Sequence, residues 1–101
     1  MKKILHLNLK SEYFNDIKNG KKDFEYREYN DHWMKRLSQR HYDEVHFKCG
    51  YPKKDDTDKI IIRKYVGYVI KEIKHKHFFN EKENDLPIKV FAIFTKGYES
   101  Y

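Results

Sequence analysis

The sequence predicts one α+β domain over residues 1–101, a small mixed β-barrel of roughly five or six strands flanked by about two or three short helices. The chain has 101 residues, close to the commonest size of a single domain. An aromatic share of 17% supplies enough apolar area for a core, although 38% of the residues are charged. Strand and helix patterns alternate along the chain, and they lie too close together for parallel crossover units.

The first part of the chain predicts a strand, a helix and a second strand. Leucines alternate with polar residues over positions 4–9, as in a half-buried strand. Ser11 can cap the helix that follows, and Asn19-Gly20 can end it. Positions 23–28 then predict a strand with aromatic residues on one face and charged residues on the other.

The rest of the chain predicts a second helix and further strands. Asn30 or Asp31 can cap the helix, and the helical spacing of Trp33 with later apolar residues places Trp33 in the core. Gly67 predicts a bulge or bend that lets one long strand turn the corner of a barrel. The expected strands cover residues 42–49, 60–73 and 88–94.

Net charge indicates the class of partner. The formal charge of +6 favours a polyanion, with nucleic acid ahead of an anionic membrane, and the alternative is that the lysines only keep the protein soluble. Cys49 is the only cysteine, so no internal disulfide can form. The first residues are too polar for a signal peptide and no apolar run is long enough to span a bilayer, so the expected location is the cytoplasm. No phosphate loop or dinucleotide motif is present, and no cofactor is expected.

The octet from Gly20 to Arg27 is the candidate functional site. Gly20 allows a positive backbone angle at the helix end, so Lys21 and Lys22 emerge at a fixed point. Glu25 and Arg27 share a strand face with roots about 7 Å apart, and can therefore pair or grip a ligand. The planar fork of arginine suits a phosphate or a base edge, whereas lysine acts as a mobile point charge. The alternative is a solvated surface pair, Glu25 with Arg27, beside two solvated lysines.

This octet, set between a helix and a strand, resembles the ASCH domain, a relative of the RNA-binding PUA fold. The specific part of the resemblance is the Gly-x-Lys-x-x-Glu-x-Arg spacing from Gly20 to Arg27. It implies a PUA-like β-barrel with a cleft beside the motif that receives RNA or a nucleotide. Some members hydrolyse modified nucleosides, such as acetylated cytidine, or RNA.

The resemblance also supplies an enzymatic alternative. Lys22 matches the catalytic lysine of the hydrolytic members, and Glu25 would be its catalytic neighbour. Those amidohydrolases have a threonine at the position of Glu25, however, and they use a distal glutamate, for which Glu81 and Glu83 are candidates. Because binding requires fewer special conditions than catalysis, hydrolysis is the alternative reading. A protein-interaction module is the third.

Other residues extend the expected nucleic-acid track. Tyr26 can stack on an unpaired base, and basic residues further along can contact phosphates. The full predicted binding set is Lys21, Lys22, Glu25, Tyr26, Arg27, Lys53, Lys54 and Arg63. A zinc site would need ligands from His46, Cys49, His75 and His77, but no paired cysteines accompany them, so no metal is expected.

Overall fold

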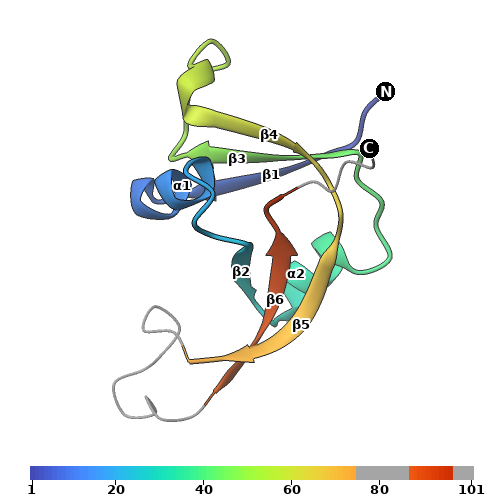
Figure 1. Cartoon of the computed structure of the whole chain (residues 1–101). Helices are drawn as coiled ribbons and strands as arrows, with labels where there is room; N and C mark the ends of the chain where they lie inside the picture. Colours follow the sequence, from blue (N-terminus) through green and yellow to red (C-terminus); the bar gives the residue numbers. More distant parts are fainter. Residues whose placement is uncertain (75–86, 97–101) are drawn as a thin grey trace, which may run out of the picture.

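The computed structural model describes residues 1–74 and 87–96, which form an α+β fold of two three-stranded sheets with helices beside them (Figure 1). Within these residues, no helix has both the length and the apolar character needed to cross a membrane. The elements in chain order are β1 (Ile4–Leu9), α1 (Ser11–Lys18), β2 (Phe24–Glu28), α2 (Asp31–Leu37), β3 (Glu44–Cys49), the 3-10 helix η1 (Thr57–Lys59), β4 (Ile60–Lys64), β5 (Tyr68–Ile73) and β6 (Ile88–Phe94).

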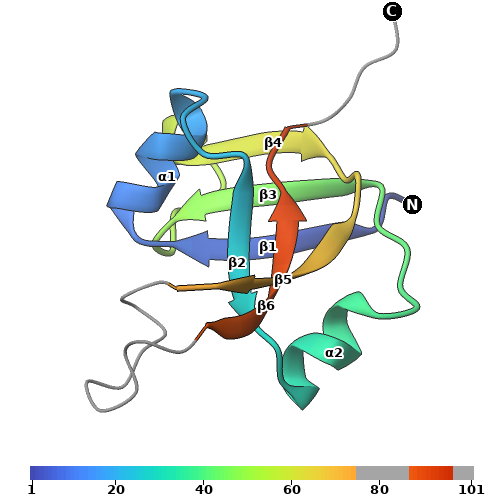
Figure 2. The ribbon, with the colours of Figure 1, turned by 60° about the horizontal axis from the view of Figure 1, so that its bottom comes forward.

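The two sheets have the strand orders β1-β3-β4 and β2-β6-β5. Strands of the second sheet cross over those of the first (Figure 2). All the pairs are antiparallel except β1 with β3, which are parallel, so the expectation that no parallel crossover occurs was wrong. The reason is that the chain forms α1, β2 and α2 after β1 and before β3, and this long connection lets it return in the same direction.

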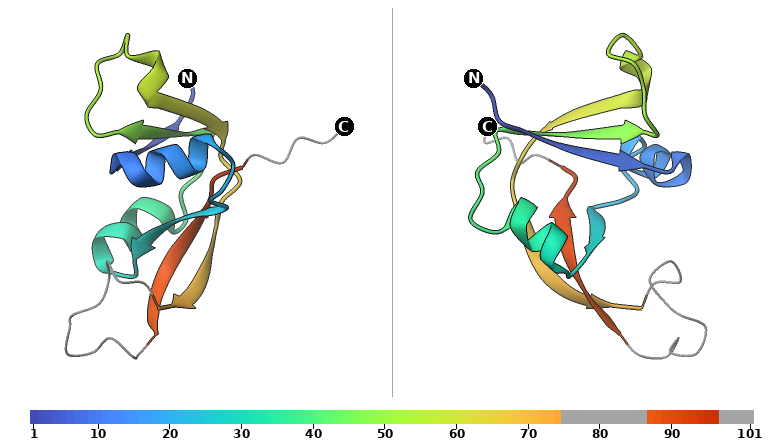
Figure 3. Two further views of the ribbon diagram at one scale, coloured as in Figure 1. Left: turned by 60° about the vertical axis from the view of Figure 1, so that its left-hand side comes forward. Right: turned by 180° about the vertical axis from the view of Figure 1, so that it is seen from behind.

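The hydrophobic core lies between the sheets. The leucines of β1 alternate inward as predicted, and α1 packs against β1 and β3 while α2 lies beside β2 (Figure 3). Each fully buried leucine, isoleucine or phenylalanine stabilises the fold by about 1.5–3 kcal/mol relative to an exposed one. The core cluster consists of Leu5, Leu7, Leu9, Phe14, Ile17, Leu37, Val45, Phe47, Ile61, Phe91 and Ile93.

The ends of the two helices agree with the predictions from sequence, except at Ser11. Asn30 is the N-cap of α2, and its side chain accepts a hydrogen bond of 3.0 Å from the Trp33 backbone N–H, as expected. Ser11 is not a cap, because it is already the first helical residue of α1 and Lys10 occupies the cap position without a side-chain bond. Gly20 ends α1 in the left-handed region at φ +73°, as its position after Asn19 predicts.

The run 60–73 is two strands rather than one long bent strand. β4 belongs to the first sheet and β5 to the second, and the chain crosses between the sheets at residues 65–67. Gly67 has φ +127°, a backbone angle open mainly to glycine, so the corner lies where the sequence predicted it. Among the described strands, no hydrogen-bonded ladder joins the two sheets into a closed barrel.

Candidate functional site

The backbone holds Lys22 in a fixed position at the end of α1. The N–H groups of Gly20 and Lys21 donate to the carbonyls of Ile17 and Asp16 at 3.1 and 2.8 Å, the pattern of a Schellman motif. The buried Thr95 then donates from Oγ1 to the Lys22 carbonyl at 2.5 Å. The chain therefore leaves the helix along one defined path.

The charged face of β2 turns inward. Glu25 lies opposite Ile93 and Arg27 opposite Phe91, and residues opposite each other in a ladder share a sheet face. Both partners on β6 belong to the buried core. Glu25 and Arg27 therefore point into the space between the two sheets.

The side chains of Lys22, Glu25 and Arg27 meet there, and we call them the triad. Lys22 Nζ lies 3.4 Å from Glu25 Oε1, and Arg27 Nη2 lies 3.0 Å from Glu25 Oε2. Their side chains are 15%, 7% and 20% exposed, respectively. The alternative of a solvated surface pair is therefore wrong.

Burial sets the electrostatics of the triad. It raises the pKa of Glu25, against the opposing effects of Arg27 and Lys22. It also lowers the pKa of Arg27, against the effect of Glu25, and the nearby Arg36 lowers it further. Two cations share one carboxylate, so the triad carries an excess positive charge in partly desolvated surroundings, where charges interact more strongly than in bulk water.

Two tyrosine rings enclose the Lys22 ammonium. Its Nζ lies 4.5 Å from the ring centroid of Tyr13, on α1, and 5.1 Å from that of Tyr26, on β2. Cation–π contacts of this kind contribute about 0.5–2 kcal/mol each. They hold the ammonium beside Glu25 and place aromatic surface next to it.

Two arginines bind the free edge of β1. Arg27 donates from Nη2 to the Asn8 carbonyl and Arg36 donates from Nη2 to the His6 carbonyl, each at 3.1 Å. The Trp33 ring contacts both guanidinium groups, with its centroid 5.0 Å from Arg27 Cζ and 4.7 Å from Arg36 Cζ. Side chains thus occupy the place beside β1 where another strand would pair in a closed barrel.

One hydrogen-bond donor of Arg27 remains without a partner among the described residues. Its Nε is buried and has no hydrogen-bond partner in the part of the chain that the structure describes. Leaving a buried donor unpaired is unfavourable by about 1–3 kcal/mol, more for a charged group. A guest that offers an oxygen to this N–H would remove that penalty.

The remaining predicted binding residues are not all brought to the triad. Lys21 is exposed beside Lys22, and Tyr26 contacts the Lys22 ammonium. Lys53 and Lys54 are exposed in the connection between β3 and β4. Arg63 lies on β4, which β3 separates from β1. The structure therefore groups the residues of the octet and leaves Lys53, Lys54 and Arg63 on the other sheet.

Metal ligation finds no support in the described residues. His46 and Cys49 are three positions apart on β3 and so lie on opposite faces, with Cys49 packed against the core. No group of three or more metal-ligating side chains occurs within residues 1–74 and 87–96. His75 and His77 lie outside the described residues, as do the candidate distal acids Glu81 and Glu83.

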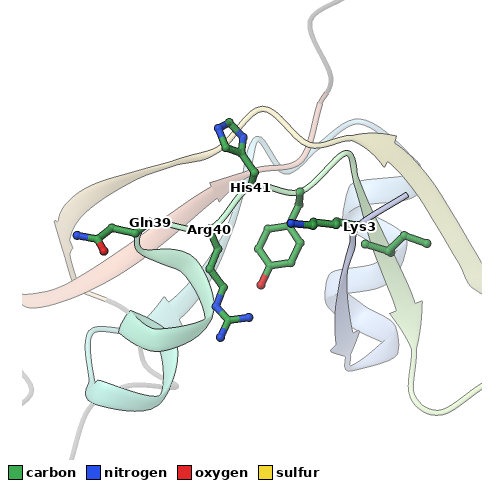
Figure 4. Close-up of a pocket in the computed structure, with 6 residues that line it drawn as sticks. Lys3, Gln39, Arg40 and His41 are labelled. Atoms are coloured by element: carbon green, nitrogen blue, oxygen red, sulfur yellow. The ribbon is translucent and has the colours of Figure 1, made fainter. Parts of the chain in front are cut away.

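Three hollows occur on the described surface. One of about 520 Å³ is formed by residues 39–42 together with Lys3 and Ile4 (Figure 4). A second, of about 400 Å³, lies where residues 8–11 meet residues 49–51, and a third, of about 330 Å³, lies on the first sheet. None of the three is lined by Lys22, Glu25 or Arg27, so they do not provide the cleft expected beside the motif.

Sequence reasoning missed several members of the site. Trp33 is half-buried at the edge of the core and contacts both arginines, rather than lying in the core alone. Arg36 lies three residues after Trp33 on the same helix face, a spacing that could have indicated their contact. Thr95 and the Asn8 carbonyl give no such signal, because strand pairing and sheet packing bring them in from distant parts of the chain.

Compared with protein-family models, curated proteins and solved structures, the chain matches none of them. The geometry of the triad is therefore the basis on which a function is proposed.

Proposed function

We propose that this chain binds RNA, or a nucleotide portion of it, at the triad, as a PUA-like domain of the ASCH type. The observation that carries the proposal is the largely buried excess of positive charge, together with the Arg27 Nε that lacks a partner among the described residues. An anion at this point would compensate the positive charge of the triad and accept a hydrogen bond from the Arg27 Nε–H. The overall charge of +6 adds long-range attraction for polyanions.

Each side chain has a role that fits this ligand. The Arg27 guanidinium offers a planar fork to a phosphate, and the Lys22 ammonium adds a point charge. Glu25 holds both cations at fixed positions and accepts hydrogen bonds from an exocyclic amine of a base. Tyr26 or Trp33 can stack on that base, which contributes about 1–3 kcal/mol.

The test is the salt dependence of binding to a single-stranded RNA oligonucleotide, followed by fluorescence anisotropy. Removing one phosphate contact with Lys22→Gln should weaken binding and reduce the slope of log affinity against log salt by about 0.7. Lys18→Gln is the matched control, since Lys18 is an exposed lysine in the last turn of α1. Equal slopes for wild type, Lys22→Gln and Lys18→Gln would overturn the proposal.

A second substitution separates charge from geometry. Arg27→Lys keeps the positive charge but loses the planar fork and the Nε donor. We expect it to weaken RNA binding while the salt slope changes little. Affinity equal to wild type would contradict the role given to the fork.

The second candidate is hydrolysis of a modified nucleoside or of RNA. The observation in its favour is the raised pKa of the buried Glu25, whose carboxylate lies 3.4 Å from Lys22 Nζ. A carboxyl group with a raised pKa suits general acid–base chemistry near neutral pH. Wild type, Lys22→Ala and the control Lys21→Ala should be incubated with acetylated cytidine and with single-stranded RNA. Turnover that only Lys22→Ala abolishes would place hydrolysis ahead of simple binding.

A further inference from the structure

The third hollow, on the outer face of the first sheet, differs in chemistry from the triad. Two rows of the strand register form its floor: His6, His46 and Ile62 lie side by side across β1, β3 and β4, and Lys48 lies opposite Ile60 in the next row. The connection between β3 and β4, which contains η1 and rises at one end of the sheet (Figure 1), supplies Pro52, Lys54 and Thr57 as a wall. The enclosed volume is about 330 Å³, at the lower end of the range for small-molecule sites.

Apolar side chains on this face have no cover in the described structure. The side of a sheet that faces water normally alternates to polar residues. Ile62 nevertheless points outward and is 54% exposed, beside Ile60. The imidazoles of His6 and His46 pack edge to face with centroids 5.3 Å apart, which adds aromatic surface.

The residues that line the hollow carry only positive charge. Lys48 and Lys54 line it, and none of its lining residues carries a carboxylate. Glu44, on the same strand face as His46, is held by the Lys2 ammonium and by His46 Nε2 at 2.9 and 3.1 Å. Partial burial lowers the pKa of His6, and the charges of Lys48, His46 and Arg36 lower it further.

We propose that this hollow binds a small organic anion with a flat apolar body, such as an aromatic carboxylate, sulfonate or phosphate. The body would lie on the isoleucines and Pro52, and the anionic group would accept hydrogen bonds from the lysines and from the His6 imidazole. The triad offers cations and aromatic rings, but it has none of the aliphatic side chains on which the body of this ligand would lie. The two sites lie on opposite sides of the first sheet, because His6 and His46 alternate with the inward-facing Leu5, Leu7 and Val45.

The probe is naphthalenesulfonate, titrated into the whole chain and followed by NMR. We expect the imidazole C–H signals of His6 and His46 to shift together with the methyl signals of Ile60 and Ile62, while the Trp33 indole signal stays in place. Inorganic sulfate and the neutral naphthalenemethanol, each carrying half of the chemistry, should bind at least about tenfold more weakly. Shifts that spread evenly over the protein, or sulfate binding as tight as naphthalenesulfonate, would overturn the proposal.

Two matched pairs of variants locate the probe. Ile62→Ser should weaken binding by about tenfold, whereas Ile70→Ser, at an isoleucine of similar exposure on β5, should not change it. Lys48→Gln should weaken it by a similar factor, whereas Lys64→Gln, on the same face of the first sheet but outside the hollow, should have little effect. Equal losses within either pair would contradict the assignment.

Lys22→Gln separates this proposal from the one for RNA. It should leave naphthalenesulfonate binding unchanged, because Lys22 lies on the other side of the first sheet. If Lys22→Gln and Lys48→Gln weakened the binding of naphthalenesulfonate equally, the proposed site on the outer face of the first sheet would be refuted, whatever the result for RNA.

Discussion

Arg27→Met is the substitution that probes the triad most sharply. It removes the ion pair with Glu25 at 3.0 Å, the hydrogen bond to the Asn8 carbonyl at 3.1 Å and the cation–π contact with Trp33. The Glu25 carboxylate, whose side chain is only 7% exposed, is then left with Lys22 at 3.4 Å as its partner. Methionine keeps much of the volume, so the main change is electrostatic.

The expected loss in the free energy of unfolding follows from the burial of the Glu25 carboxylate. Removing one partner of a buried ion pair destabilises a protein by about 3–5 kcal/mol, because it leaves an uncompensated charge. Lys22 still compensates part of the Glu25 charge, so we expect about 3 kcal/mol. At about 4–8 °C per kcal/mol for a domain of this size, Tm should fall by about 12–24 °C.

The double variant Glu25→Gln/Arg27→Met tests the cause of the loss. With the carboxylate gone, no buried anion remains without its partner, and neutral groups of similar volume often replace a buried pair without loss. The double variant should therefore regain more than half of the stability that Arg27→Met loses. A simple packing defect would not be repaired in this way.

Urea denaturation at neutral pH measures these differences, and Arg63→Met is the matched control. Arg63 is a half-buried arginine on the inner face of β4, and among the described residues it donates one long hydrogen bond of 3.3 Å, to the carbonyl of its neighbour Ile62. Its substitution should change the free energy of unfolding by less than about 1 kcal/mol. The reasoning is refuted if Arg27→Met and Arg63→Met cost the same, or if the double variant is no more stable than Arg27→Met.

Four further outcomes are expected. Burial raises the pKa of Glu25 above its ordinary value of 4.5, so the stability that Glu25 contributes is fully present below that value and is lost as pH rises through the folded pKa. Urea titrations at several pH values should therefore show wild type losing stability relative to Glu25→Gln as pH rises from about 4. A stability difference that stays constant with pH would contradict this. Asn30→Ala removes the cap of α2 and should lower the free energy of unfolding by about 1 kcal/mol, whereas no loss would show that the bond to Trp33 N–H contributes nothing. Thr95→Val deletes the bond to the Lys22 carbonyl and should cost about 1 kcal/mol and weaken RNA binding, while unchanged values for both would remove Thr95 from the site. Burial raises the pKa of Tyr65 to about 12, so ultraviolet titration should lose its latest-ionising component in Tyr65→Phe, and an unaltered curve would count against that burial.

Local patterns predicted the elements of this fold well. The alternating leucines of β1, the Asn30 cap and the glycine that ends α1 all depend on residues close together in sequence. The partners of the strands depend on the whole chain. The parallel pairing of β1 with β3 and the division of residues 60–73 between two sheets could therefore not be read from local spacing.

In the candidate site, too, local sequence predicted some features and long-range packing decided the others. Alternation in β2 placed Glu25 and Arg27 on one face, but it could not say that this face turns toward the core, because charged side chains rarely do so. The inward orientation follows from pairing with β6, some sixty residues later in the chain. Arg36 and the Asn8 carbonyl enter the site through that same packing.

The NMR signal of the Arg27 Nε–H, followed during titration with a short single-stranded RNA, tests ligand binding at the triad most directly. We expect this signal to shift more than those of Arg40 and Arg63, and its proton to exchange more slowly with water, as the phosphate accepts its hydrogen bond. RNA that binds while the Arg27 Nε–H signal stays in place would contradict the claim that the triad is where this chain holds its ligand.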